Sequence, residues 1–155
     1  MSSFEVDPVT ENEKSLWPSK PLVDLQKPFV DKRGSIQPLV DLMMKSAVMI
    51  ESKAGSLRAN HYHKTDWHYC YVIQGKIEYF HRELNSSSKA ELIIVKKGNM
   101  IFTPPLVEHC MKFPEDTLFL TLSRNPRDQE TYEADVVRVN LIDTKDSITW
   151  KPDDH

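Results

Sequence analysis

Cysteine is scarce in this chain of 155 residues, which contains only Cys70 and Cys110. Two cysteines are too few for a disulfide framework of the kind that stabilises small secreted domains, and they suit a reducing compartment. Long apolar runs are missing as well, because apolar runs such as 46–50 and 92–95 fall far short of the roughly 20 residues that a membrane span needs. The sequence therefore predicts a protein that neither crosses a membrane nor depends on disulfides.

An excess of positive charge is also absent. Lys and Arg number 20 against 23 Asp and Glu, which gives a formal net charge of −3. Domains that bind nucleic acids electrostatically are usually basic, so we expect no nucleic-acid partner. Residues 1–10 carry Glu5 and Asp7 where a secretory signal would have a basic start and an apolar stretch. We expect a cytoplasmic protein that acts on a small molecule.

The chain is long enough for one domain and too short for two full cores. Residues 1–28 contain Pro8, Pro18, Pro21 and Pro28, which leave no room for a long helix, so we expect an extended N-terminal arm. Residues 143–155 are mostly polar and are expected to form a C-terminal tail. The domain itself is predicted over residues 29–142.

Short apolar or alternating runs, separated by turn residues, fill that middle region. These runs are residues 35–42, 47–51, 68–73, 76–81, 90–95, 100–104, 108–113 and 118–123. Many short runs with Gly, Asn, Asp or Pro between them are typical of a β-sandwich or barrel. Helix is expected only as a turn or two near residues 125–133. The predicted fold class is all-β.

Histidines form the most informative pattern. Two segments, 55–75 and 98–109, begin with glycine and together carry His61, His63, His68 and His109. Residues two apart on a strand point to one face, so His61 and His63 can converge, and an antiparallel sheet can bring His109 beside them. Converging imidazoles indicate a site for a divalent transition metal such as Zn, Fe, Ni, Mn or Cu. The alternative is a histidine-lined cavity without a metal.

The two segments resemble the paired motifs of the cupins, G-x5-H-x-H-x3,4-E-x6-G and G-x5-P-x-G-x2-H-x3-N. The resemblance covers residues 46–123 and implies a double-stranded β-helix, or jelly-roll, barrel with the metal in its mouth. It implies that His61, His63 and His109 are metal ligands and that His68 takes the position of the glutamate ligand.

Three departures from the motifs stand out. His68 is neutral where the motif has an anionic ligand, which leaves a bound metal with more positive charge and makes it a stronger Lewis acid. Leu106 stands in place of the glycine of the second motif, and Phe113 in place of its asparagine.

Two further stretches, 29–34 (FVDKRG) and 55–62 (GSLRANHY), are similar to segments of the cupins that act on deoxythymidine-diphosphate keto-sugars, the 3,5-epimerases and 3,4-ketoisomerases. This narrower resemblance implies that Arg58 contacts the sugar nucleotide and that His61 removes a proton next to a keto group. The epimerases work without a metal, so His61 is either a ligand or a free base, and the sequence leaves both open.

An isomerase or epimerase needs an acid or base in addition to the metal ligands. Alternation after Gly75 places Ile77, Tyr79 and His81 on one face of a strand, and the more apolar face should point inward. Tyr79 and His81 are therefore our candidate acid or base, and Arg58 our candidate clamp for a phosphate or carboxylate.

The predicted function is isomerisation or epimerisation of a carbonyl-bearing, sugar-derived substrate, possibly a sugar nucleotide. One alternative is an Fe-dependent cupin dioxygenase, since neutral histidines can hold Fe(II). Another is a non-catalytic module that senses a small molecule or a metal. Cupins of this size commonly pair, so we expect a homodimer in which the arm could lie across the partner.

Overall fold

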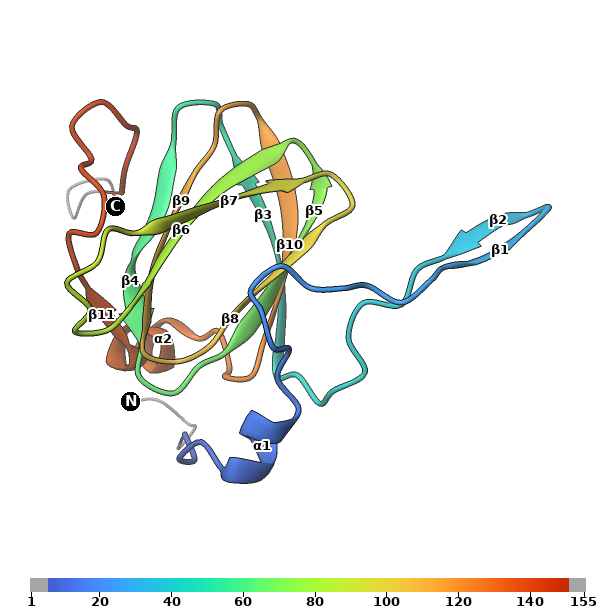
Figure 1. The fold of residues 1–155 in the computed structure, drawn as a ribbon, viewed down its shortest axis with the longest axis horizontal. Helices are drawn as coiled ribbons and strands as arrows, with labels where there is room; N and C mark the ends of the chain where they lie inside the picture. The colour runs from blue at the N-terminus through green and yellow to red at the C-terminus, as the bar shows by residue number, and fades with distance from the viewer. Residues whose placement is uncertain (1–5, 151–155) are drawn as a thin grey trace.

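Residues 6–150 are described by the computed structural model, and two antiparallel sheets that face each other form the body of the molecule (Figure 1). The four-stranded sheet has the order β3-β10-β5-β8, and the five-stranded sheet has the order β11-β4-β9-β6-β7. Their strands are β3 (Ser46–Ser52), β4 (Leu57–His63), β5 (His68–Gln74), β6 (Lys76–Glu83), β7 (Glu91–Lys96), β8 (Met100–Thr103), β9 (Val107–Lys112), β10 (Thr117–Ser123) and β11 (Val136–Arg138). The predicted all-β fold class is confirmed.

The core between the sheets is built from alternating side chains of both. Val72 and Phe119 come from the four-stranded sheet, and Ile77 and Tyr79 from the five-stranded sheet. All four are exposed by 2% or less. Burial of Ile77 and Tyr79 confirms the inward face that the alternation of β6 predicted.

A second apolar cluster covers the outer face of the four-stranded sheet. Trp67, Tyr69, Met100 and Phe102 are buried there beneath residues of the N-terminal arm and of segment 39–44. This explains why the predicted strand 35–42 is wrong beyond Ile36, the end of β2 (Gly34–Ile36). Its apolar side chains pack on this outer face, and its backbone does not join a sheet.

The N-terminal arm lies along its own barrel and includes a short helix, α1 (Glu11–Ser15). Thr10 and Glu13 form a capping box that starts this helix. Further along, the Phe102 backbone N–H donates to Pro21 O at 2.8 Å, which joins the arm to β8. The spacing of the prolines predicted only an extended chain. The capped helix α1 and the hydrogen bond to β8 instead hold the arm in one conformation against the barrel.

Two smaller elements complete the fold. β1 (Phe29–Asp31) pairs with β2 in a hairpin that projects away from the barrel (Figure 1). The predicted turn of helix near residues 125–133 is α2 (Gln129–Asp135), which starts at the Asp128 cap and lies against one end of the barrel. Across residues 6–150, no helix is both long and apolar enough to cross a membrane.

Candidate functional site

The five-stranded sheet aligns three histidines in one row. His61 on β4 lies opposite His109 on β9, and His109 lies opposite His81 on β6. A bulge in β4, where Ala59 and Asn60 have φ of 68° and 65°, shifts the register just before His61. Directly opposed residues project from the same face of a sheet, so the three rings share one side.

Four of the imidazoles converge at one end of the barrel. The His61 ring lies 4.8 Å from His63 and 4.7 Å from His109, and the His68 ring lies 5.3 Å from His63 and 5.5 Å from His109, measured between centroids. All four side chains are buried. The donor atoms of His61, His63 and His109 lie within 4.8 Å of one another. Metal–nitrogen bonds of about 2.0–2.1 Å place neighbouring ligand atoms roughly 3–4 Å apart, so the cluster needs only a small contraction to surround an ion.

Three of these rings are oriented through their Nδ1 atoms. His63 Nδ1 is 3.3 Å from Asp135 Oδ2, His109 Nδ1 is 3.0 Å from Val107 O, and His68 Nδ1 is 3.6 Å from Asp66 Oδ2. Metal-binding histidines usually contact a carboxylate or carbonyl in this way, which leaves Nε2 for the ion. The donor set therefore fits a divalent transition metal.

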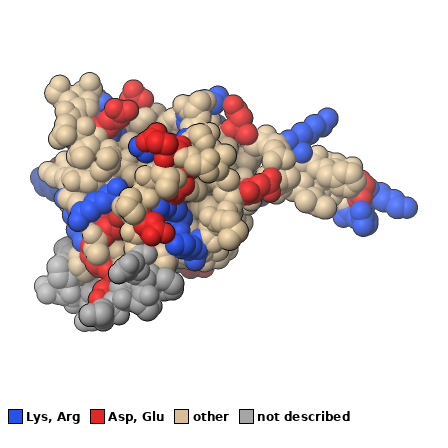
Figure 2. All heavy atoms as spheres, turned by 90° about the horizontal axis from the view of Figure 1, so that it is seen from below, with Lys and Arg blue, Asp and Glu red and all other residues tan. Residues whose placement is uncertain are grey.

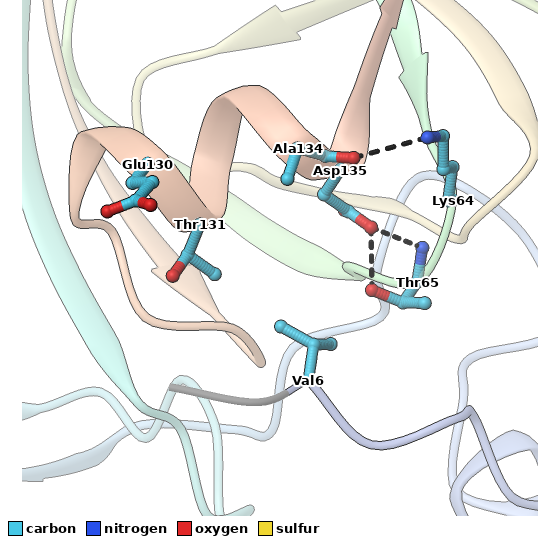
Figure 3. Close-up of a pocket in the computed structure, with 7 residues that line it drawn as sticks. All are labelled: Val6, Lys64, Thr65, Glu130, Thr131, Ala134 and Asp135. Atoms are coloured by element: carbon cyan, nitrogen blue, oxygen red, sulfur yellow. Dashed lines mark hydrogen bonds between the residues drawn. The ribbon is translucent and has the colours of Figure 1, made fainter. Parts of the chain in front are cut away.

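The two carboxylates are themselves held by the backbone. Asp135 accepts hydrogen bonds from the backbone N–H of Thr65 at 2.9 Å and of Asp66 at 3.0 Å, and Asp66 accepts from Asn125 N–H at 2.8 Å. A cavity of about 370 Å³ lies beside α2, where Asp135 reaches toward Thr65 (Figure 3). Sequence reasoning missed both acids. Only Asp66 had a local signal, its position two residues before His68.

Burial keeps three of the four clustered histidines neutral, namely His61, His68 and His109. It lowers the pKa of His61 and His109 well below the usual value, and the neighbouring histidines lower it further. Burial also lowers the pKa of His68. Burial raises the pKa of Asp135, but hydrogen bonds from His63 and Thr65 outweigh it and bring the pKa to about 2. Near neutral pH the site thus offers the uncharged imidazoles of His61, His68 and His109 and the ionised carboxylate of Asp135, the protonation states that metal binding requires.

The two predicted acid–base residues lie next to this cluster. The Tyr79 ring stacks 6.3 Å from His109 and 5.5 Å from His81, and its hydroxyl is 2.7 Å from Thr103 Oγ1. Burial raises the pKa of Tyr79 and lowers that of His81. His81 Nε2 is buried without a hydrogen-bond partner among residues 6–150, with Glu91 Oε2 at 3.6 Å.

Tyr79 and His81 both line a cavity of about 480 Å³. Its other walls are residues 17–21 of the arm, the loop that follows β6, and Phe102, Pro104 and Val107 around the start of β9. Val107 is the residue whose carbonyl holds His109. None of the four clustered histidines lines the cavity itself, and Tyr79 and Val107 are the residues that both line it and contact His109.

Arg58 is not brought to the histidines. Its guanidinium donates to Ser52 Oγ at 2.7 Å and to Glu51 O at 2.8 Å, contacts that tie β4 to β3. Another arginine does lie near the cluster: Arg127 stacks 3.6 Å above the ring of Tyr132, which lies 5.7 Å from His63. Sequence reasoning missed both residues, because α2 folds over the barrel end from far along the chain.

Comparisons with known proteins identify the fold. No family model matches the chain, and no curated protein matches it either. Solved structures do match. The sugar 3,4-ketoisomerase QdtA from Thermoanaerobacterium thermosaccharolyticum, in complex with TDP, has a TM-score of 0.62 and 20% identity over 77% of this chain and 87% of that one. The dTDP-4-dehydrorhamnose 3,5-epimerase from Sulfolobus tokodaii has a TM-score of 0.65 and 18% identity over 86% and 92%.

The chain has the cupin fold. A third match, the capsular polysaccharide assembling protein CapF from Staphylococcus aureus, has a TM-score of 0.57 and 21% identity, and it covers 78% of this chain and 33% of that one. The resemblance drawn from the histidine motifs and from segments 29–34 and 55–62 is thus confirmed for the cupin fold, in which these enzymes are the structural neighbours.

Proposed function

We propose that this cupin is a metal-dependent isomerase or epimerase that acts on a carbonyl-bearing sugar nucleotide. The observation that carries the proposal is the pairing of four convergent imidazoles with a cavity that holds a candidate base and a candidate acid. The ketoisomerase and epimerase activities of structures with the same fold support it.

The histidine cluster would hold the metal through His61, His63, His68 and His109, with Asp135 and Asp66 orienting two of the rings. The bound metal would supply Lewis-acid polarisation of the substrate carbonyl, which acidifies the neighbouring C–H. This assignment makes His61 a ligand and not a free base.

His81 is the base in this proposal. Its lowered pKa keeps the ring neutral near pH 7, and a neutral imidazole can accept the proton from the carbon next to the carbonyl. Tyr79 has a raised pKa and stays protonated, so it can hold or return a proton within the same cavity. Return of the proton to the same carbon from the other side gives epimerisation. Ketoisomerisation instead moves the proton from the hydroxyl-bearing carbon to the carbonyl carbon, while a second proton moves from the hydroxyl oxygen to the carbonyl oxygen.

Proton exchange tests the proposal directly. Protein purified without added metal is assayed for metal content and then incubated in D2O with TDP-4-keto-6-deoxyglucose, with deuterium uptake followed by NMR. We expect one transition-metal ion per chain and deuterium next to the keto group. His81→Ala should lower the exchange rate about 100-fold or more while retaining the metal.

Other results would replace the proposal. Exchange that is undiminished after the metal is removed would return His61 to the role of free base. Stoichiometric iron with oxygen uptake on diketones or catechol-like compounds would favour the dioxygenase alternative. Metal without exchange or oxygen uptake would favour the sensing module.

The β1–β2 hairpin supports a homodimer. Phe29, Val30 and Ile36 are 60%, 67% and 64% exposed on a two-stranded element that projects from the barrel. An isolated hairpin of this kind is marginally stable in water, and an apolar partner surface would stabilise it. A second copy of the chain is the partner that we propose.

A cytoplasmic location is also part of the proposal. Cys70 and Cys110 are free and buried, and burial raises the pKa of each thiol to about 12, which makes both inert. Inert, unpaired thiols are compatible with a reducing compartment.

A further inference from the structure

Trp17, in the N-terminal arm, presents an unused hydrogen-bond donor. Its Nε1 is buried and has no hydrogen-bond partner in the part of the chain that the structure describes. The neighbouring Trp67, whose ring centroid is 6.2 Å away, donates its own Nε1–H to Glu13 Oε1 at 3.0 Å. Buried donors are nearly always satisfied, so the difference between the two rings requires a physical reason.

The unused donor belongs to a residue that lines the 480 Å³ cavity. Trp17 and His81 both line this cavity, and each has a buried ring nitrogen without a hydrogen bond. A hydroxyl group can accept from an indole N–H and can donate to a neutral imidazole nitrogen. A ligand with hydroxyl groups could therefore form hydrogen bonds with both Trp17 Nε1 and His81 Nε2.

The surroundings of Trp17 favour a sugar ring over a phosphate. The cavity wall next to it consists of flat apolar groups, Phe102 at 5.8 Å between ring centroids, together with Pro18, Pro21 and Pro104. Such surfaces accommodate the C–H face of a pyranose and do not solvate a charged oxygen. Three basic side chains line the cavity: Arg82 pairs with Glu108, Lys20 pairs with Asp24, and Lys89 is exposed to solvent.

Contacts on both sides of Trp17 fix its position. Upstream, Glu13 of α1 accepts from Arg124 Nε at 2.7 Å as well as from Trp67. Downstream, Pro21 O accepts from the backbone of Phe102 at 2.8 Å. A donor held in place before the ligand arrives loses little entropy on binding, which suits it to recognition.

We propose that Trp17 is a substrate-binding residue whose indole N–H donates to a ring hydroxyl oxygen of the sugar. The inference rests on the proposed function, since it places the sugar of that substrate in the cavity beside the histidines. It adds a specificity-determining residue outside the histidine motifs and outside the barrel.

The test uses Trp17→Phe, which retains an aromatic ring against Trp67 and Phe102 and removes only the donor. Isothermal titration measures the binding of TDP-4-keto-6-deoxyglucose and of TDP alone to the full chain, loaded with its metal. We expect the Kd of the sugar nucleotide to rise roughly tenfold in the variant, the effect of one neutral hydrogen bond, and the Kd of TDP to stay unchanged. Trp67→Phe serves as the matched control, because it loses a donor that is already bonded to Glu13. It should lower Tm and leave both Kd values unchanged.

The outcomes separate the inference from the proposed function. Equal sugar-nucleotide binding by wild type and Trp17→Phe overturns the inference and leaves the proposed function intact. An equal loss of TDP affinity also overturns it, because the donor would then contact the nucleotide or its phosphates. A loss of sugar-nucleotide affinity in Trp67→Phe as large as that in Trp17→Phe would assign the effect to packing. Failure of the wild type to bind either ligand overturns the proposed function, and the inference with it.

Discussion

At the scale of single residues, left-handed backbone conformations are concentrated beside the histidines. Ala59 and Asn60 immediately precede His61, and Leu106, with φ of 63°, donates its N–H to His63 O at 2.8 Å. Residues other than glycine pay about 1–2 kcal/mol for this conformation. The barrel thus tolerates local strain where it positions the clustered histidines, a common property of functional sites.

Replacing Leu106 with glycine should relieve part of this strain. Its side chain is half exposed, so little packing is lost. We expect Leu106→Gly to raise the free energy of unfolding by about 0.5–1 kcal/mol in chemical denaturation. Leu106→Ala keeps a Cβ and should give no gain. A loss of stability in the glycine variant would contradict this account.

Asp135 should contribute to metal affinity through His63. Asp135→Asn retains the shape of the side chain but removes the charge that faces the ring, and loss of such a contact typically weakens metal binding 10–100-fold. Competition with a chromophoric chelator for Zn²⁺ measures the change. Asp143→Asn, at an exposed position, is the control and should bind as the wild type does. Unchanged Zn²⁺ affinity in Asp135→Asn would refute the orienting role.

The residue scale also shows what sequence could supply. Motif spacing predicted the four histidines, and alternation predicted the inward face of Tyr79, because both depend on local strand geometry. Asp135 and Tyr132 could not be predicted in this way. They reach the site only because α2 packs over the barrel end, a tertiary contact with no local pattern.

At the scale of elements, α1 is attached to the barrel through one carboxylate. Glu13 accepts hydrogen bonds from Thr10, Trp67 and Arg124. The last two connect the arm with the residue just before β5 and the residue just after β10. The prolines of this region predicted its extended parts but not α1. The five residues of α1 are too few to form a helix alone, and the capping box and the distant Arg124 stabilise it.

This attachment predicts a pH dependence of stability. Burial raises the pKa of Glu13, but hydrogen bonds from Arg124, Thr10 and Trp67 outweigh it and bring the pKa to about 2, below the ordinary 4.5. A carboxyl with a lowered pKa stabilises the folded state above its unfolded pKa, and this stabilisation is lost as the pH falls from about 4.5 to about 2.

The measurement compares unfolding free energies at pH 6 and pH 3 for wild type and Glu13→Gln. We expect about 1–2 kcal/mol of the acid-induced loss in the wild type to be absent from the variant, after allowance for partial solvent screening. Identical losses in the two proteins would show that Glu13 contributes nothing to acid sensitivity.

At the scale of the whole molecule, the β1–β2 hairpin is the element that the barrel leaves uncovered. It projects well beyond the body of the molecule, and basic side chains lie at its tip (Figure 2). Elsewhere on the face seen in Figure 2, acidic and basic side chains are interspersed. We therefore propose the exposed apolar hairpin, and not a charged patch, as the surface that contacts the second copy of the chain.

Removing the apolar side chains of the hairpin should weaken the proposed dimer. Light scattering after size exclusion should give twice the mass of the 18.0 kDa chain for the wild type. Val30→Ser with Ile36→Ser should shift the mass toward the monomer, and Met43→Ser, which alters a fully exposed residue outside the hairpin, should not. A wild-type mass of one chain would exclude this interface.

The position of Asp135 in the chain has a consequence for biosynthesis. The four histidines are translated by residue 109, yet the carboxylate that orients His63 follows 26 residues later, on α2. A nascent chain whose barrel strands have emerged from the ribosome still lacks Asp135, the partner of His63. If the histidines hold the proposed metal, tight binding of the ion would have to wait until α2 has emerged, and an incomplete polypeptide would bind cations more weakly than the finished chain.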